Sequence, residues 1–464
     1  MADTRLLDPG FPPAGEDAWR ALVAKTLGDK PFESLAKSTV EGLPIAPLYA
    51  AADSPGAFPA RPFEADRPWD VRTLCAHADP ARANVELLAD LEGGAASVIV
   101  AGHATADALA RALKDIIVEL APVGLDAGFL GPKAADALHA VAKASPGARL
   151  NFHLDPLSAF AEAGASPGPI ESHLVNAANV AVRHAQTYPQ AQLFLASGRV
   201  AHEAGAGEAE EVALAAAAAI AYAKALVRAG LPVGEAFARI TLGLSADADY
   251  FLTIAKLRAA RAVFARLAAA SGASPQARIE ARSSRRMLTA KDAWTNMIRL
   301  TAAGFGAAVG GADAVVLGQF TDALGLPTPF ARRQSRNTQL VLMEEANIGR
   351  VADPAAGAGY LEALTDQIAR AAWARMQAIE AAGGVIAALE QGLVAGAVEA
   401  AVAARGQPKI LGVTAFSPAS DEAVAVEAGE PARLDPEPAR LPGPDSRCPT
   451  LKAQRLSEPH EAAA

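Results

Sequence analysis

The feature that most restricts the fold is a regular alternation of short apolar runs and longer helical stretches between about residues 95 and 385. Runs rich in β-forming residues occur at 96–102, 123–131, 148–155, 192–198, 238–245, 276–284, 312–319 and 347–354. Each run is followed by a stretch with apolar residues at helical spacing. Repeated strand-then-helix units predict a parallel sheet, because a helix returns the chain to the edge where the first strand began.

Two arrangements of such units are known in α/β proteins. A doubly wound open sheet typically has a G-x-G-x-x-G phosphate-binding turn after its first strand. The segment "AGHATADA" at 101–108, which follows the first run, lacks that pattern. Eight units in about 290 residues fit a closed barrel instead. We therefore predict an α/β protein with a (β/α)8 TIM barrel over residues 95–405.

The two ends of the chain have a different composition from the barrel region. Residues 1–94 are short helical pieces interrupted by prolines, which predicts an irregular arm that needs another surface to lie against. Residues 406–464 are rich in Pro, Glu and Ala, which predicts an extended, partly disordered tail. We assign contacts with another subunit to the N-terminal arm.

Charge and composition exclude several classes of function. The net charge of −9 at pH 7 argues against nucleic acid as a partner, since phosphate binding needs clustered Lys and Arg. The most apolar stretch, 212–231, is dominated by Ala and contains Lys224 and Arg228, so no membrane span is predicted. With no export signal and only two cysteines, Cys75 and Cys448, the protein is expected in the reducing cytoplasm.

Chemistry on a barrel of this kind lies on the loops that follow the strands, and few reactive residues occur there. Four arginines near one strand end could clamp a phosphate or carboxylate, but solvated or interface arginines fit equally well. They are Arg278, Arg282, Arg285 and Arg286. His202 and Glu203 could form an acid–base couple, or they could simply begin an acidic helix. Asp155, which precedes Pro156, is typical of a helix N-cap. The sequence contains no H-E-x-x-H, G-x-S-x-G or Cys/His metal spacing, so no metal is predicted.

A series of motifs resembles one family. The chain is similar to the second half of the substrate barrel of the methylmalonyl-CoA mutase family in this order: "GADA" at 311–314, "ALGLPTPF" at 323–330, "RNTQL" at 336–340, "RVADPAAGAGYLE" at 350–362 and "EAAGG" at 380–384. The N-terminal segment "FPPAGEDAWRALVAKTL" and the segment "SSRRMLT" resemble the small subunit of the two-chain bacterial enzymes. The resemblance covers about residues 8–458 and is highly specific.

This resemblance implies a reaction as well as a fold. In the family, adenosylcobalamin is homolysed between a barrel and a cobalamin domain, and the substrate thioester threads the barrel axis. A radical rearrangement then interconverts methylmalonyl-CoA and succinyl-CoA, a step of propionate metabolism. The difficult chemistry belongs to the cofactor, while the barrel provides seclusion and orientation.

The resemblance also shows where this chain departs from catalytic members. Their large subunits read Ser-Gly-Tyr-His-x-Gln-Glu-Ala-Gly-Ala after the fourth strand, and that His hydrogen-bonds the substrate carbonyl. Alignment on Ser197 places Arg199 at the Tyr, Val200 at the His and His202 at the Gln. A second catalytic Tyr, three positions before Arg-Pro-Trp, is replaced by Glu64. Because valine cannot donate a hydrogen bond, we predict no catalytic residue in this chain.

The remaining expectations follow from the same resemblance. Arg278, Arg282, Gln339 and His202 are the candidates for substrate binding, with acyl-CoA bound weakly at most. The cobalamin signature Asp-x-His-x-x-Gly does not occur, so this chain is expected to bind no cofactor and to lack the C-terminal cobalamin-type domain. We expect a heterodimer with a large subunit that carries adenosylcobalamin. Two alternatives stay open: an active mutase barrel served by a separate cobalamin-binding chain, and a free-standing acyl-CoA-binding or scaffold protein.

The isolated chain should neither bind adenosylcobalamin nor isomerise methylmalonyl-CoA, because it has no lower-ligand histidine domain and no carbonyl-polarising histidine. Cobalamin absorbance after gel filtration and conversion of methylmalonyl-CoA with the cofactor added are the two measurements. Turnover by the purified chain would refute the prediction.

Overall fold

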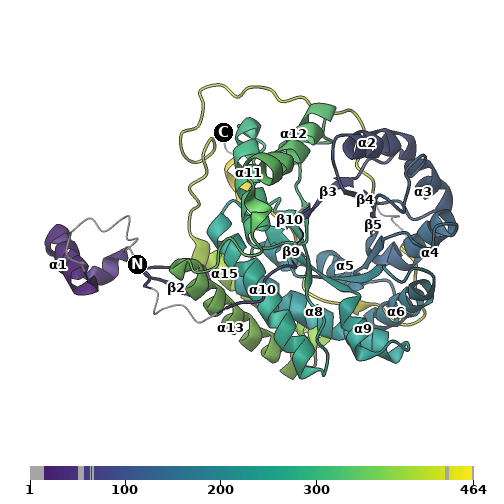
Figure 1. Ribbon diagram of the computed structural model, residues 1–464, viewed down its shortest axis with the longest axis horizontal. Coiled ribbons are helices and arrows are strands. Elements are labelled where there is room, and N and C mark those ends of the chain that lie inside the picture. The colour runs from purple at the N-terminus through teal and green to yellow at the C-terminus, as the bar shows by residue number, and fades with distance from the viewer. Residues whose placement is uncertain (1–14, 51–56, 63, 65–66, 434–437, 462–464) are drawn as a thin grey trace, which may run out of the picture.

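Eight parallel strands close into a barrel at the centre of the molecule (Figure 1). The computed structural model describes residues 15–50, 57–62, 64, 67–433 and 438–461. Around the barrel the strands are β3 (Asp70–Cys75), β4 (Ser97–Ala101), β5 (Val123–Asp126), β6 (Leu150–Leu154), β8 (Gln192–Ser197), β9 (Ile240–Ala246), β10 (Arg278–Ser283) and β11 (Ala314–Val316), which pairs with β3. The predicted (β/α)8 TIM barrel is confirmed.

Helices separate successive strands and form the outer layer (Figure 1). In chain order they are α2 (Pro80–Glu92), α3 (Ala106–Ala112), α4 (Gly131–Ala142), α5 (Pro156–Ala163), α6 (Ile170–Thr187), α7 (Arg199–Ala204), α8 (Glu208–Arg228), α9 (Val233–Ala238), α10 (Tyr250–Ala270), α11 (Asn296–Val309) and α12 (Pro329–Leu340). Three more, α13 (Gly359–Ala381), α14 (Val385–Glu390) and α15 (Leu393–Arg405), follow α12, which itself comes after the last barrel strand, and the short α16 (Glu458–Glu461) lies in the tail. Among the described residues, each helix is too short or too polar to cross a membrane.

One predicted strand is wrong and one barrel strand was missed. Residues 347–354 form a 3-10 turn, Ile348–Arg350, and a loop, because Asn347 takes a left-handed conformation with φ 55° that ends the preceding helix. The barrel is completed instead by β3, which lies inside the region that we assigned to the arm. The barrel therefore begins near residue 70, and the predicted boundary at residue 95 is too late.

The helix α8 explains the Ala-rich run of the sequence. It packs against β8 and β9 on one side and against α10 and α13 on the other, and residues 208–219 are all buried. A helix that is covered on every side needs apolar residues all round. Alanine satisfies this requirement while it lets the neighbouring elements approach closely.

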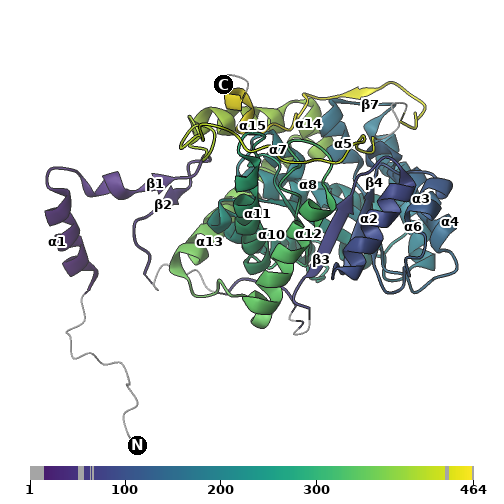
Figure 2. The same cartoon turned by 90° about the horizontal axis from the view of Figure 1, so that it is seen from above.

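The N-terminal arm divides into a part that lies on the barrel and a part that does not. The helix α1 (Glu16–Leu27) has no buried residue and stands away from the barrel (Figure 2). The hairpin of β1 (Lys37–Ser38) and β2 (Pro44–Ile45) holds Glu41, whose carboxylate accepts hydrogen bonds from the backbone N–H of Ala209 at 2.9 Å and Glu210 at 3.0 Å. Glu41 thus caps the N-terminus of α8, where a negative charge stabilises the helix.

The C-terminal tail runs over one end of the barrel beside α14 and α15 (Figure 2). It forms a bridge between Pro431 and His77, and another between Glu427 and Leu326. Its short strand β12 (Ser446–Arg447) pairs with β7 (Ala165–Ser166), and Leu451 is buried. The described part of the tail therefore packs on the barrel with little regular secondary structure of its own.

Candidate functional site

A cavity of about 1150 Å³ lies at the carboxyl ends of the barrel strands, beneath the tail. Strand ends provide Asp126, His153, Ser197 and Arg282 to its wall, and the tail provides residues 426–429, Pro431, Ala432, Leu451 and Ala453. Loops after parallel strands are where barrel enzymes place their chemistry. The volume is sufficient for a ligand of the size of a cofactor or a large metabolite.

An ion-pair network fills the bore below this cavity. Glu280 is fully buried and receives Nη1 of Arg72 at 2.6 Å and Nε of Arg282 at 2.7 Å. Arg72 also pairs with Asp70, and Arg282 with Asp126, each at 2.6 Å. Burial alone would raise the pKa of Glu280, but the two guanidiniums outweigh it and hold the pKa below its ordinary value. Arg282 is therefore primarily committed to closing the barrel.

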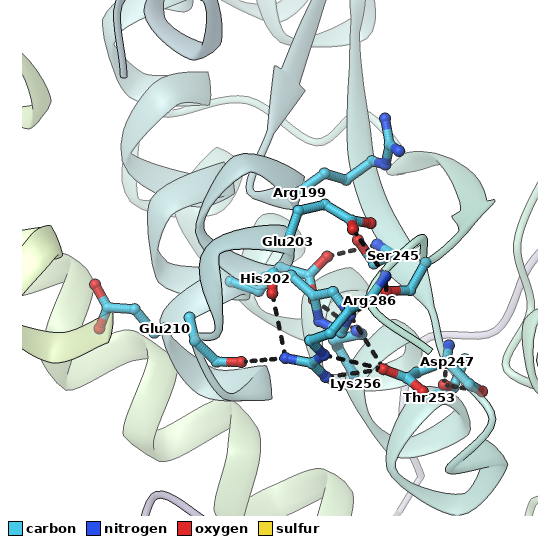
Figure 3. Close-up of polar contacts among 12 residues, drawn as sticks. Arg199, His202, Glu203, Glu210, Ser245, Asp247, Thr253, Lys256 and Arg286 are labelled. Atoms are coloured by element: carbon cyan, nitrogen blue, oxygen red, sulfur yellow. Dashed lines mark hydrogen bonds and ion pairs between the residues drawn. The ribbon is translucent and has the colours of Figure 1, made fainter. Parts of the chain in front are cut away.

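His202 lies outside the cavity. Its ring is fully buried between Glu211, whose carboxylate is 3.0 Å from Nδ1, and Ser284, whose hydroxyl is 3.0 Å from Nε2 (Figure 3). Lys256 pairs with the same Glu211 at 2.6 Å. Asp247 completes the group, 3.3 Å from Nε2 of His202.

The neighbouring Glu203 takes a separate position. It lines the cavity and accepts backbone hydrogen bonds from Arg285 and Arg286 at 3.2 Å. His202 and Glu203 consequently do not form an acid–base couple, and the predicted contact of His202 with substrate in this cavity is not supported.

The other predicted binding residues are also dispersed. Arg278 is exposed at the first position of β10, at the opposite end of the strand from the cavity. Gln339 is buried on α12, where its Oε1 accepts a hydrogen bond from the Trp69 ring nitrogen at 3.3 Å. Neither residue lines the cavity. Of the four candidates, only Arg282 does.

Two of the three degenerate positions do meet in the cavity. Arg199 and Val200, the first residues of α7, both line it, since α7 begins where β8 ends. Glu64 is exposed and precedes β3, so it belongs to the amino end of the barrel. Arg199 and Val200 therefore lie together at this cavity, whereas Glu64 lies elsewhere.

Sequence reasoning missed the unusual carboxyl groups of this site. Asp155 caps α5 as predicted, accepting from the Ser158 N–H at 3.1 Å, but it also accepts from the Tyr222 hydroxyl at 2.5 Å. Burial raises the pKa of Asp155 to about 7 and that of Asp322, also in the cavity wall, to about 6. The Asp155-Pro156 pair in the sequence indicated only the helix cap. The contact with Tyr222 could not be predicted, because Tyr222 lies on α8, far along the chain.

Comparisons with known proteins agree with this architecture. The family model for methylmalonyl-CoA mutase matches residues 139–437. The methylmalonyl-CoA mutase small subunit of Streptomyces virginiae is 39% identical over 467 residues, which cover 93% of this chain and 74% of that protein. The small subunit of Propionibacterium freudenreichii subsp. shermanii is 35% identical over 411 residues, covering 81% of this chain and 63% of that protein.

The fold and the cavity thus define a (β/α)8 barrel with its site at the carboxyl ends of the strands. The matches then make the assignment specific: the chain belongs to the methylmalonyl-CoA mutase family, and the relatives above are small subunits of that enzyme. The resemblance drawn from the motifs is confirmed.

Replacing Lys256 with methionine should lower the free energy of unfolding by about 3–5 kcal/mol, because it leaves the buried Glu211 carboxylate without its ammonium partner. Urea denaturation of the full chain measures the change. Lys224→Met is the control: Lys224 pairs with Glu380 at 2.9 Å but its side chain is 58% exposed, so about 0–1 kcal/mol is expected. Equal stability of the two variants would contradict the burial argument.

Asp155→Asn should change how stability depends on pH. The raised pKa means that the folded chain retains a proton that the unfolded chain releases, so this group's contribution to stability falls as pH rises from about 4 to about 7. Asparagine retains an acceptor for Ser158 and Tyr222 but does not titrate. The variant should therefore gain stability relative to the parent across that interval, as measured by denaturant unfolding. Parallel pH profiles would show that Asp155 is ionised in the fold.

Proposed function

We propose that this chain is the non-catalytic small subunit of an adenosylcobalamin-dependent methylmalonyl-CoA mutase, paired with a large subunit that isomerises methylmalonyl-CoA to succinyl-CoA. The observation that carries this proposal is the position of Val200. It lines the cavity at the place where the resemblance puts the carbonyl-polarising histidine. A valine there leaves the thioester carbonyl without a donor. His202, two residues further on, is buried in its own network and does not replace it.

The residues around the cavity do not fit a cobalamin cofactor bound by this chain. A cobalt ligand would need an imidazole that presents a free nitrogen to the face of the barrel. His77 and His153 are the histidines in the cavity wall, and each uses Nδ1 in a backbone hydrogen bond. The other ring nitrogen of His153 lies 3.5 Å from the Glu280 carboxylate in the buried bore, so it does not face a ligand above the barrel. Tail residues Gly429 and Pro431 lie directly over His77. We therefore place the cofactor in the proposed partner, and the cytoplasmic location stays a prediction from the sequence.

The free part of the arm supports a role in assembly. In α1, Leu22 is 65% exposed, and no residue of the helix is buried by the rest of the described chain. Trp19 forms a T-shaped pair with Phe32 from the same arm, with ring centroids 5.8 Å apart. Each such apolar side chain would contribute about 1.5–3 kcal/mol on burial. A second subunit is the surface that we propose for it.

A variant that lacks residues 1–36 should bind the large subunit at least about tenfold more weakly than the full chain, because about 1.4 kcal/mol of lost contact energy has that effect. The deletion removes α1 but retains Glu41, which the barrel needs to cap α8. Size-exclusion chromatography with light scattering on the co-expressed pair measures the complex. Val200→Ala, which changes only the cavity, is the control and should assemble normally.

Two results would contradict this function. If the full chain runs as a monomer beside the large subunit, the pairing is wrong. If the truncated chain still co-elutes completely at sub-micromolar concentration, the arm is not part of the interface.

A further inference from the structure

The most exposed large apolar side chain of the described chain belongs to Phe416, in the tail segment that follows α15. Phe416 is 80% exposed, and the ammonium of Lys409 lies over its ring, 5.7 Å from the centroid. Its backbone is also strained, because a φ of 52° lies in the left-handed region that bulky L residues rarely adopt. An aromatic residue that is exposed and strained does little for the folding of this chain, and such strain is typical of functional positions.

The loop that carries Phe416, residues 408–416, is held in shape by its own hydrogen bonds. The Ile410 N–H donates to the Thr414 hydroxyl at 2.8 Å, and that hydroxyl donates to the Pro408 carbonyl oxygen at 2.9 Å. Phe416 therefore lies at the end of an ordered loop.

The same loop is fixed to α11. Nη2 of Arg299, on that helix, donates to the Leu411 carbonyl oxygen at 2.8 Å. Leu411 itself is exposed, and so is Ile298, the neighbour of Arg299 on α11. Ile298, Leu411 and Phe416 are thus three exposed apolar residues on the loop and on the helix that holds it. We refer to these three residues as the Phe416 patch.

The loop begins on the side of the molecule from which the N-terminal arm projects. Glu41 of the arm lies against Gly207, and Val402, in the last turn of α15, lies against Gly205 in the same segment. Arg405, the last residue of α15, donates from Nη2 to the Gly205 carbonyl oxygen at 3.1 Å, and the loop follows directly. Figures 1 and 2 both show α15 on the side where the arm leaves the barrel.

The arm by itself is too small for a stable interface with another protein. A standard interface takes about 800 Å² from each partner, or about 20–30 residues on each side. The helix α1 has 12 residues, and only one face of it can meet a partner. A stable complex therefore needs a second surface on the barrel itself. The Phe416 patch is such a surface, and aromatic residues are enriched at the centres of interfaces.

We propose that the Phe416 patch is a second contact surface for the large subunit, which receives the Phe416 ring in an apolar socket with a carboxylate near Lys409. This inference rests on the proposed function, because that subunit is the partner. The loop is already ordered, so little conformational freedom is lost when the ring is bound. The Lys409 ammonium forms no ion pair with a carboxylate of the described chain, which leaves it free for an acidic group of the partner.

The test is biolayer interferometry between the full chain and the methylmalonyl-CoA mutase large subunit of the same organism, each purified separately. Phe416→Asn should raise the Kd by about tenfold or more, as the loss of a central aromatic contact does. Asparagine tolerates the left-handed conformation, so the loop should retain its shape and the thermal unfolding midpoint should not fall. Lys409→Glu should also raise the Kd, with a larger effect at low ionic strength.

Leu120→Asn is the matched control and should leave the Kd unchanged. Leu120 is 75% exposed in the segment after α3, and α3 lies on the opposite side of the barrel from the arm (Figure 1). Equal affinity of the unaltered chain and Phe416→Asn overturns this inference and leaves the proposed function intact. Absence of any complex with the unaltered chain overturns both. A lower unfolding midpoint of Phe416→Asn shows that the ring serves the fold, which also overturns the inference.

Discussion

The buried carboxylate of Glu280 is the interaction on which the barrel depends. Barrel bores of this type are normally filled by layers of branched apolar side chains, whereas here the centre holds a carboxylate between Arg72 and Arg282. Three strands are joined through it, since Arg72 comes from β3 and Asp126, the second partner of Arg282, from β5. Burying such charges is tolerable only when each is paired. The same pairing leaves Nη2 of Arg282 buried without a hydrogen bond.

A second buried network determines which side chain of α7 faces the cavity. His202, Glu211, Lys256 and Asp247 join α7, α8 and α10 behind the strands. On α7 a residue two positions further on lies about 200° round the helix, so anchoring His202 inward turns Val200 towards the cavity. A hydrogen-bond donor at this place in the cavity wall would therefore have to come from a substitution of Val200 itself. Movement of His202 would break the network instead.

The C-terminal tail and the N-terminal arm lie differently with respect to the barrel. The tail packs over the carboxyl ends of the strands and forms one wall of the cavity. The arm is anchored by Glu41 to α8. The helix α1 projects away from the barrel (Figure 2), and its Leu22 is exposed. The tail therefore belongs to the cavity wall, whereas α1 contributes no residue to it.

The sequence by itself determined the barrel and the family, because strand-then-helix alternation and motif order are local patterns. It could not show that β3 is a barrel strand, since Asp70 and Arg72 appear too polar for one. Arg72 is neutralised by Asp70 from its own strand and by Glu280, which lies 208 residues away. Nor could the sequence show that Arg199 and Val200 line the cavity, whereas His202, Arg278 and Gln339 do not. Which way a side chain faces, and which distant charge meets it, was decided only when the tertiary structure closed the barrel.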